Sequence, residues 1–230
     1  MMIRAILPAS DYIYLSRFTS ADPTRYQLHG VSIEAGPVMV ATDGHRLGAL
    51  RLEAKEGFHA GVPFILSASN ELIRACKVAK REQAWLICRE DRVDVMTFDC
   101  NVNVEAAALQ RYTGAAAFSF PASAYYLDGT FPDWRRLFPR ASAGSRGFLQ
   151  NGKTDHVGYS ADYLADFRSA NAVGVSFDGN GSDPAIIANS DPRFIGLLMP
   201  MRSGLAPAAI LDRMRTVTGI APSTEQSDAG

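Results

Sequence analysis

Apolar and polar positions follow the same order three times along the chain. Each time, a short apolar stretch leads into a segment with helical spacing of apolar residues, and strand-like alternation follows. Ser10, Ser69 and Ser160 stand where the three helices begin, so we expect them to be N-caps. The pattern predicts an α+β fold in which a β-α-β-β-β unit occurs three times.

The element boundaries follow from where each pattern starts and stops. Helices are expected at residues 11–20, 70–82 and 161–172. Strands are expected at residues 3–10, 26–35, 37–52, 62–69, 84–90, 92–99, 155–160, 173–178, 185–190 and 194–200. The Asp43-Gly44 pair favours a tight turn, and the "EDR" and "DGNGSD" stretches favour hairpin connections.

Two segments interrupt this rhythm, and the end of the chain departs from it. Residues 101–127 are expected to form an excursion from the second unit, and residues 140–153 are small and polar enough for a linker. Pro207 is expected to open a short helix that ends near Gly219. The apolar stripe of that helix is expected to cover part of the surface pocket described below or an adjoining subunit contact.

The bulk composition is that of an ordinary globular protein, with 47% hydrophobic residues, 20% charged residues and a net charge of −1. No apolar run reaches the ~20 residues of a membrane helix, and the first residues do not resemble a signal peptide. A cytoplasmic protein without membrane contact is therefore expected. The spacing of Cys76, Cys88 and Cys100 suits neither a zinc site nor a disulfide framework, so reduced thiols are expected.

One predicted helix has a basic face. In residues 70–82, Arg74, Lys77 and Arg81 lie opposite the apolar side, with Lys80 at the border. Such a face can contact a phosphate backbone, and it can equally be a solvated helix surface. The other two helices contribute Arg17 and Arg168 beside acidic residues.

Three short motifs resemble a known family. "VATDGHRL" (residues 40–47), "DGTFPDWRRLFP" (128–139) and "LLMPMR" (197–202) are similar to three signatures of the bacterial DNA polymerase III β subunit, the β sliding clamp, and occur in the family's order. The resemblance covers residues 3–138 well and residues 155–202 more loosely.

This resemblance implies a DNA-clamp fold. Its β-α-β-β-β half-domains would form a ring, with helices lining a central hole and sheets outside. The ring would encircle double-stranded DNA without reading its sequence, close to the nucleoid, and a clamp loader is a possible partner. The residues expected to face DNA are Arg17, Arg74, Lys77, Lys80, Arg81 and Arg168.

The expected domain organisation differs from the family's. Residues 1–139 would form one clamp domain of two half-domains, 1–56 and 57–139, followed by the linker. Residues 154–204 would form the second half of the last domain, and residues 205–230 an additional helix and tail. The family's first domain and the first half of its last domain would be missing, so a homo-oligomer of three or four chains would be needed for a ring.

The resemblance also implies a surface pocket that binds a short peptide of polymerases or repair proteins. Apolar residues would form its floor, prolines its walls and polar residues its anchors. Its expected residues are Leu28, Thr42, Gly44, His45, Arg46, Leu47, Pro132, Arg136, Leu137, Leu197, Met199, Pro200, Met201 and Arg202. The "TDGHR" stretch on its own is equally typical of a polar hairpin.

Catalysis is not expected. Asp43 and His45, with His29 on a neighbouring strand, suggest acid–base chemistry, but no metal-binding, nucleophile or phosphate-loop motif accompanies them. The start of "DGNGSD" resembles a calcium loop without the required downstream glutamate. No cofactor and no metal are therefore expected.

An alternative from another functional class remains open. A chain with the three pocket signatures and only one strongly basic helix also fits an interaction module that does not form a ring. Such a module would bind clamp-binding peptides and compete with, or regulate, the host clamp.

Overall fold

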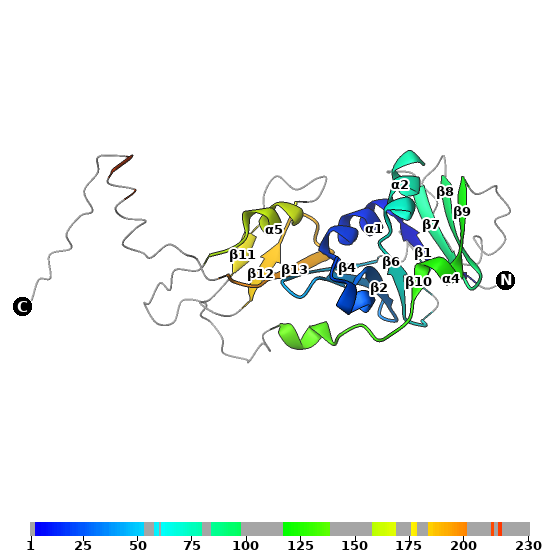
Figure 1. The fold of residues 1–230 in the computed structure, drawn as a ribbon, viewed down its shortest axis with the longest axis horizontal. Helices are drawn as coiled ribbons and strands as arrows, with labels where there is room; N and C mark the ends of the chain where they lie inside the picture. Colours follow the sequence, from blue (N-terminus) through cyan, green and yellow to red (C-terminus); the bar gives the residue numbers. More distant parts are fainter. Residues whose placement is uncertain are drawn as a thin grey trace, which may run out of the picture.

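The computed structural model describes residues 3–52, 58–59, 61–79, 84–97, 117–138, 158–168, 176–178, 184–201, 213 and 216–217. Its strands form two antiparallel sheets, of five and eight strands (Figure 1). Lys80, Arg81, Arg202, the predicted linker 140–153, and most of the predicted helix that begins at Pro207 lie outside these residues.

The five-stranded sheet has the order β5-β1-β7-β8-β9. Its strands are β5 (Phe58–His59), β1 (Ile3–Pro8), β7 (Ala84–Arg89), β8 (Arg92–Thr97) and β9 (Phe118–Pro121). The eight-stranded sheet has the order β10-β6-β2-β3-β4-β13-β12-β11. Its strands are β10 (Tyr126–Leu127), β6 (Phe64–Ser67), β2 (Gly30–Glu34), β3 (Val38–Thr42), β4 (Arg46–Arg51), β13 (Phe194–Leu198), β12 (Ala185–Ala188) and β11 (Ser176–Asp178).

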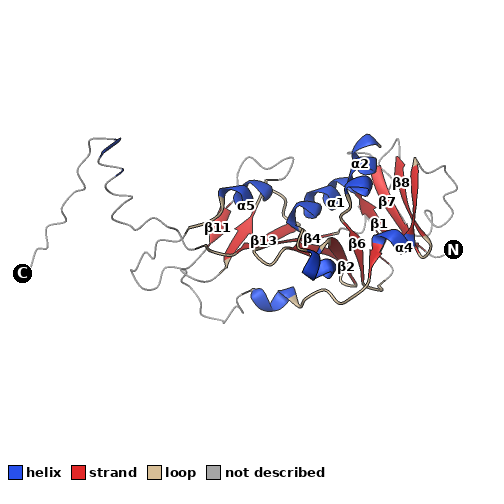
Figure 2. Ribbon diagram, viewed as in Figure 1, coloured by secondary structure: helices blue, strands red, loops and turns tan. Residues whose placement is uncertain are grey.

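The helical elements connect these strands. The α-helices are α1 (Ala9–Leu15), α2 (Asn70–Val78), α4 (Ala122–Tyr125) and α5 (Ala161–Asp166). The 3-10 helices are η1 (Ser16–Phe18), η2 (Pro23–Leu28) and η3 (Trp134–Leu137). Helices α2, α1 and α5 follow one another along one side of the sheets, and η3 lies on the other side (Figures 1 and 2).

We name three units by this order of elements. Unit 1 contains β1, α1, β2, β3 and β4; unit 2 contains β6, α2, β7, β8 and β9; unit 3 contains α5, β11, β12 and β13. Units 1 and 2 exchange their first strands, because β1 pairs with β7 and β6 pairs with β2. Unit 3 joins unit 1 through the pairing of β13 with β4, which continues the sheet across the two units. The units are therefore not separate modules.

Several sequence predictions need correction at the level of elements. The excursion predicted for residues 101–127 contains β9, the last strand of unit 2, because the outer edge of β8 pairs with Phe118–Pro121. The strand predicted for residues 26–35 begins only at Gly30, after the 3-10 helix η2. Residues 101–116 lie outside the described part.

The predicted caps are right for two of the three helices. The Ser69 side chain accepts a hydrogen bond from the Leu72 N–H, and Ser160 accepts one from the Tyr163 N–H. Ser10 is not an N-cap, because α1 starts directly after β1 and Pro8 occupies the cap position. The chain thus enters α1 two residues earlier than the sequence suggests.

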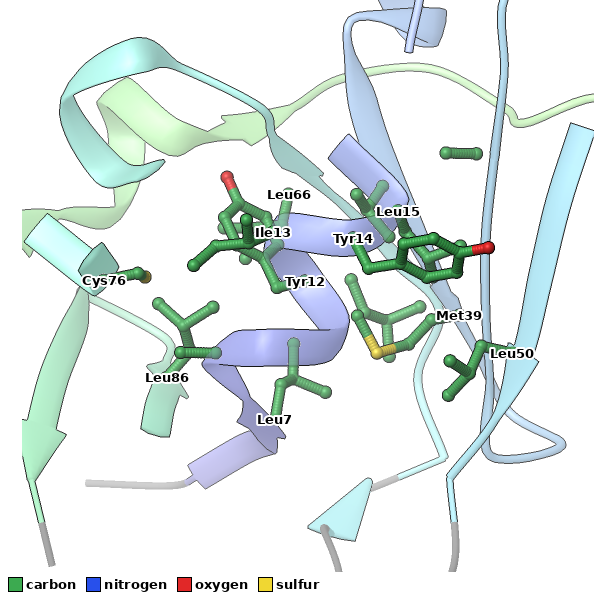
Figure 3. Packing of buried hydrophobic residues seen from close by; sticks show 14 of the residues in the cluster. Leu7, Tyr12, Ile13, Tyr14, Leu15, Met39, Leu50, Leu66, Cys76 and Leu86 are labelled. Atoms are coloured by element: carbon green, nitrogen blue, oxygen red, sulfur yellow. The ribbon is translucent and has the colours of Figure 1, made fainter. Parts of the chain in front are cut away.

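The main core lies between the helices and the two sheets. Tyr12 and Leu15 on α1 are fully buried with Met39 and Leu50 of the larger sheet, and the side of α2 that carries Cys76 closes the same core (Figure 3). Cys76 and Cys88 are free, buried thiols, as expected for reduced cysteines. Burial raises the pKa of each thiol to about 12, so neither is a thiolate at neutral pH.

Aromatic packing holds unit 3 against unit 1. Phe18 contacts Phe167 with ring centroids 5.0 Å apart, and Tyr14 contacts Phe194 at 5.2 Å. The Tyr14 hydroxyl donates a hydrogen bond to the Phe167 carbonyl oxygen at 2.9 Å. A charged group crosses the same junction, because Arg193 in the β12–β13 loop pairs with Asp11 on α1 at 3.1 Å.

This junction predicts a pH dependence of stability. Burial raises the pKa of the Asp191 carboxyl, but hydrogen bonds from the Arg193 side chain and N–H outweigh it and hold that pKa below its usual value. A carboxyl with a depressed native pKa stabilises the fold above its unfolded pKa of about 3.9, and this contribution is lost as the pH falls through the native pKa.

We therefore expect Asp191→Asn to destabilise the chain by about 2 kcal/mol at pH 7. The difference between wild type and variant should narrow below about pH 4, because the unfolded chain binds a proton at this carboxyl before the native chain does. Urea denaturation at pH 7, 4 and 3 measures this difference. Burial raises the pKa of Asp94, but hydrogen bonds from Ser119, Arg92 and Arg89 outweigh it and hold that pKa below its usual value as well. Wild type and variant lose this contribution to stability equally at low pH, so the difference between them isolates Asp191. A difference in unfolding free energy between wild type and variant that stays constant with pH would contradict the role of Asp191.

Candidate peptide-binding surface

The residues of β3, β4 and β13 alternate between the two faces of the larger sheet. On β4, Gly48 lies against the Phe18 ring and Leu50 belongs to the main core, while Leu47 and Ala49 point to the opposite face. On that face, away from α1 and α5, five buried side chains form a second cluster that we call the outer cluster. Its members are Val40, Leu47, Ala49, Trp134 and Leu197.

The outer cluster joins the three sequence signatures. Leu47 of the first signature lies directly opposite Leu197 of the third in the β4–β13 register. Trp134 of the second signature lies on η3, packs on β4 and β13, and is 7% exposed. Segments more than sixty positions apart in the sequence thus meet at the junction of unit 1 and unit 3.

Polar contacts fix Trp134 in place. Its indole Nε1 donates a hydrogen bond to the Glu34 carboxylate at 2.7 Å, and the other oxygen of Glu34 pairs with Arg135 at 2.6 Å. The Arg135 guanidinium also lies 4.4 Å from the Trp134 ring centroid. Trp134 is not among the residues expected in the pocket, although a large aromatic residue within a signature motif was the available signal.

Exposed apolar residues surround this buried centre. Leu137 is 51% exposed, Met199 40% and Met201 52%, whereas Leu47 and Leu197 are almost fully buried. The predicted apolar floor is thus of two kinds, a buried base and an accessible rim. Leu28 is buried at the end of η2 and belongs to neither the main core nor the outer cluster.

The prolines and Arg136 lie at the same rim. Pro132 is exposed and Pro200 is partly exposed. Arg136 pairs with Asp133 at 2.7 Å, with side chains that are 81% and 56% exposed. An exposed ion pair of this kind is weak, so the Arg136 guanidinium remains accessible to another anion or carbonyl group.

The stretch from Thr42 to Arg46 is a tight turn between β3 and β4. The Asp43 carboxylate accepts hydrogen bonds from the N–H groups of His45 and Arg46, and the Thr42 hydroxyl bonds to the Arg46 carbonyl oxygen at 2.7 Å. Gly44 has φ of +91°, and a Cβ there would lie 2.7 Å from Arg25 Nη1. Thr42 and Gly44, predicted to lie in the pocket, therefore form the turn itself.

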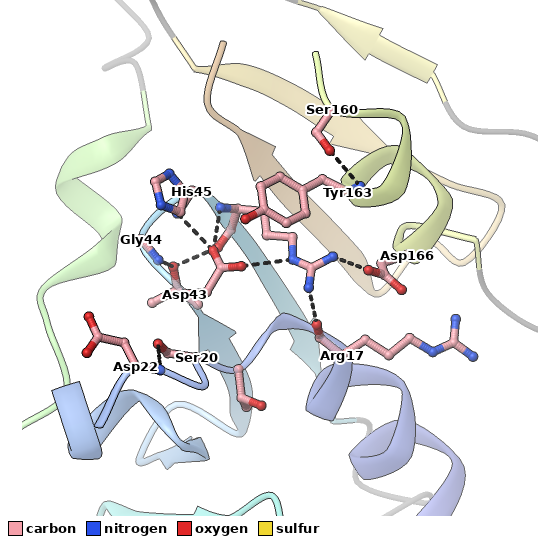
Figure 4. Close-up of polar contacts among 12 residues, drawn as sticks. Arg17, Ser20, Asp22, Asp43, Gly44, His45, Ser160, Tyr163 and Asp166 are labelled. Carbon is pink, nitrogen blue, oxygen red and sulfur yellow. Dashed lines mark hydrogen bonds and ion pairs between the residues drawn. The ribbon is translucent and has the colours of Figure 1, made fainter. Parts of the chain in front are cut away.

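Arg46 occupies the centre of a polar network. Its guanidinium donates to the carboxylates of Asp43 and Asp166 and to the carbonyl oxygen of Arg17 (Figure 4). It also lies 4.4 Å from the Tyr163 ring centroid, and its side chain is 10% exposed. Three of the five guanidinium N–H groups of this predicted polar anchor are engaged by acceptors within the chain. Arg46 is a positioning residue that ties the turn to α5 and η1.

His45 is the accessible member of the turn. Its exposed imidazole stacks on the Tyr163 ring at 6.1 Å, and its carbonyl oxygen accepts a hydrogen bond from the Met199 N–H at 2.8 Å. The backbone after β13 is thereby attached to the turn. His29, considered above as its catalytic partner, instead contacts the Asp22 carbonyl oxygen at 2.6 Å.

The cations expected to face DNA lie on the helix side of the molecule. Arg74 and Lys77 are exposed on α2, Arg168 is exposed just after α5, and Arg17 in η1 is partly exposed. Arg17 Nη1 donates to the Arg168 carbonyl oxygen at 2.9 Å, so these two residues adjoin at the junction of unit 1 and unit 3. The helix side and the outer cluster occupy opposite faces of the larger sheet.

Within the part of the chain that the structure describes, no three His, Cys, Asp or Glu side chains gather closely enough to hold a metal ion. None of the described helices combines the length and the hydropathy that a bilayer-spanning helix requires.

Comparisons with known proteins agree on one family. No family model matches the chain. The β sliding clamp of Caulobacter vibrioides is 31% identical over 131 residues, which cover 54% of this chain and 30% of that protein. The chain thus corresponds to about 30% of the length of the curated relative that it matches.

Solved structures of clamps share the fold. The Helicobacter pylori β clamp bound to a DNA ligase peptide matches 87% of this chain and 66% of its own chain, with a TM-score of 0.59 and 13% identity. The Pseudomonas aeruginosa sliding clamp with a ligand matches 86% of this chain and 65% of its own, with a TM-score of 0.55 and 18% identity. At such identities the match shows the α+β clamp fold.

The relatives bear on the expectation of a non-enzymatic protein, because the sliding clamps that the chain matches are not enzymes. The ordered signatures, the sequence match and the fold agree, and together they relate this chain to the β sliding clamps.

Proposed function

We propose that this protein is a clamp-like tether, which binds a short peptide of a polymerase or repair protein at the outer cluster. The observation that carries the proposal is the convergence of the three signatures at the β4–β13 junction. It creates a buried base with an accessible apolar rim, and small apolar sites with a few fixed polar groups are well suited to peptide anchors.

The remaining part of the proposal is a ring around duplex DNA. Homo-oligomeric chains would close the ring with Arg17, Arg74, Lys77 and Arg168 toward the hole, and the protein would act in the cytoplasm at the nucleoid. Binding through such cations is electrostatic and independent of sequence. The separation of these cations from the outer cluster by the larger sheet supports simultaneous binding of DNA and peptide.

The test of the peptide site uses a partner whose complex with a relative is known. The H. pylori clamp was solved with a DNA ligase peptide, so a fluorescent peptide of that kind is the probe. Binding to the full chain is expected by fluorescence anisotropy, and Met199→Ala together with Leu137→Ala should weaken it at least tenfold, or by about 1.4 kcal/mol.

The matched control for this test is Val78→Ala. Val78 is an equally apolar side chain, 71% exposed on α2, away from the outer cluster (Figure 1). It should leave the peptide affinity unchanged. Equal affinities of the Met199/Leu137 double variant and the wild type would place the peptide elsewhere and remove the proposal.

DNA binding makes a separate prediction. If Arg74 and Lys77 contact phosphates, replacing both by alanine should reduce the affinity for a DNA duplex uniformly across sequences. The slope of log K against log salt concentration should also become less steep by about 2, one for each lost contact. Anisotropy titrations of labelled duplex at several salt concentrations measure the slope, and Arg136→Ala on the opposite face serves as the control. An unchanged slope would show that α2 does not face DNA.

A second function has its own supporting observation. The exposed acidic residues Glu71 on α2 and Asp162 on α5 share the helix side with the cations. They weaken its attraction for phosphate, which favours a peptide-binding module that competes with the host clamp and forms no ring. Peptide binding together with an absence of salt-dependent DNA binding would identify this second function.

A further inference from the structure

The methionines of the described residues fall into two classes of exposure. Met39 in β3 and Met96 in β8 are 0% and 3% exposed, whereas Met199 and Met201 are 40% and 52% exposed. The two accessible thioethers stand two positions apart in the third signature, and both belong to the rim around the outer cluster. Within the described residues, accessible thioether sulfur is therefore concentrated at the candidate peptide-binding surface.

The backbone that carries the two exposed methionines is held on both sides. The Met199 N–H donates to the His45 carbonyl oxygen at 2.8 Å, and the Met201 N–H donates to the Gly158 carbonyl oxygen at 2.8 Å. Pro200 between them has a φ angle that its ring restricts. The side chains are thus accessible on a main chain that is fixed by hydrogen bonds, and their exposure does not come from a loose segment.

The two described thiols do not compete with these thioethers for an oxidant. A cysteine reacts with peroxides as its thiolate, and susceptibility follows thiolate character and exposure. Cys76 and Cys88 are buried, and burial raises the pKa of each thiol to about 12. Both side chains therefore stay protonated and covered at neutral pH. Among the described sulfur atoms, those at the rim are the ones that a peroxide in solution can reach.

We propose that Met199 and Met201 form an oxidation site, at which a hydroperoxide converts the thioethers to sulfoxides and thereby releases the bound peptide. A sulfur lone pair attacks the hydroxyl oxygen of the peroxide, and the O–O bond breaks. The proton of that hydroxyl moves to the other oxygen, which leaves as water or an alcohol. Each sulfur loses two electrons and each peroxide molecule gains two, so the product is methionine sulfoxide.

Oxidation weakens peptide binding because it makes the apolar rim polar. A methionine side chain fits its apolar surface to a ligand, whereas a sulfoxide oxygen is a hydrogen-bond acceptor that favours contact with water. Moving this oxygen into an apolar contact without a donor is unfavourable. The N–H groups of Met199 and Met201 already donate to carbonyl oxygens and do not compensate it. The inference rests on the proposed function, since the oxidation acts by releasing a peptide.

The experiment treats the full chain with hydrogen peroxide and follows the modification and the affinity separately. Mass spectrometry of proteolytic peptides measures the sulfoxide fraction at each methionine, and Met199 and Met201 should react about tenfold faster than Met39 and Met96, or more. Fluorescence anisotropy uses a ligase-type peptide that contains no methionine or cysteine. Its affinity for the oxidised chain should be lower by about tenfold or more, with an unchanged melting temperature.

Two further measurements connect the loss of affinity to these sulfur atoms. Methionine sulfoxide reductases with dithiothreitol should restore the affinity of the oxidised chain, because the sulfoxide oxygen leaves as water while the dithiol becomes a disulfide. In a variant with both Met199→Leu and Met201→Leu, oxidised and untreated samples should have equal affinities, whatever the affinity of the variant itself. The variant keeps Cys100, which lies outside the described residues, so the comparison also detects an effect of that thiol.

Four results would contradict the inference. They are equal oxidation rates at buried and exposed methionines, an unchanged affinity after full conversion of Met199 and Met201, a loss that the reductases do not reverse, and a loss that accompanies a lower melting temperature. A loss of affinity on oxidation of the leucine variant would place the reactive group elsewhere and would count against it equally. If the untreated chain binds no peptide, the proposed function fails together with this inference, whereas peptide binding that survives oxidation removes this inference alone.

Discussion

Replacing Arg46 by alanine should cost about 3–5 kcal/mol of unfolding free energy, the loss typical of breaking a buried ion pair. The Arg46 side chain is 10% exposed, and its removal would leave the Asp43 carboxylate, 12% exposed, without its ion-pair partner. The Asp166 carboxylate on α5 would lose its contact with the turn. Urea denaturation of the full chain at pH 7 measures this loss.

The control for Arg46 is another arginine–aspartate pair with the same spacing. Arg136 pairs with Asp133 three residues earlier, as Arg46 does with Asp43, but both side chains are mostly exposed. Arg136→Ala should therefore change stability by no more than about 0.5 kcal/mol. Arg46→Lys should recover only part of the loss, because an ammonium group lacks the planar fork that reaches three acceptors. A loss below about 1 kcal/mol for Arg46→Ala would contradict the central role of this residue.

Replacing Trp134 by alanine is the second change with a large expected effect. Truncation of a buried tryptophan removes the packing on Leu47 and Leu197 and the hydrogen bond to Glu34, and costs about 3–5 kcal/mol. Because Trp134 is the buried residue of η3, we expect faster amide exchange over residues 131–138. Peptide affinity should fall at least tenfold at the same time, since Leu137 loses its position.

Trp134→Phe distinguishes the two contributions of this residue. Phenylalanine retains most of the apolar contact and loses the bond from Nε1 to Glu34, so a smaller loss of about 1–3 kcal/mol is expected. Val78→Ala again provides the control for an exposed apolar side chain. Unchanged exchange over residues 131–138 in Trp134→Ala would show that other contacts hold the segment, and would remove Trp134 from the account of the peptide site.

Local elements were predictable where one physical rule decides them. Alternation placed Leu47 on one face of β4 and Leu50 on the other, and helical spacing placed Leu72 and Cys76 on the buried side of α2. The Asp43-Gly44 turn follows from the freedom of glycine at positive φ. The relationship to β sliding clamps could also be recognised from the sequence, because three motifs in fixed order are specific even where overall identity is low.

Errors arose where distant segments compete for the same place. Residues 118–121 resembled an excursion, since nothing local to them reveals that the edge of β8 requires a partner. The contacts of Arg46 within the chain were hidden for the same reason. Its partner Asp166 lies 120 positions away, and only the docking of unit 3 on unit 1 brings the two together.

The sequence by itself therefore determined the order of elements in units 1 and 2, the two faces of β4, the turn at Gly44 and the relationship to β sliding clamps. Tertiary structure alone decided the exchange of β1 and β6, the continuation of the sheet from β4 to β13, and the division of the predicted pocket into a buried base, a positioning arginine and an exposed rim. The physical reason is the range of the interactions. Periodicity and turn geometry depend on neighbouring residues, whereas strand partners and buried ion pairs depend on which distant surfaces exclude water from one another.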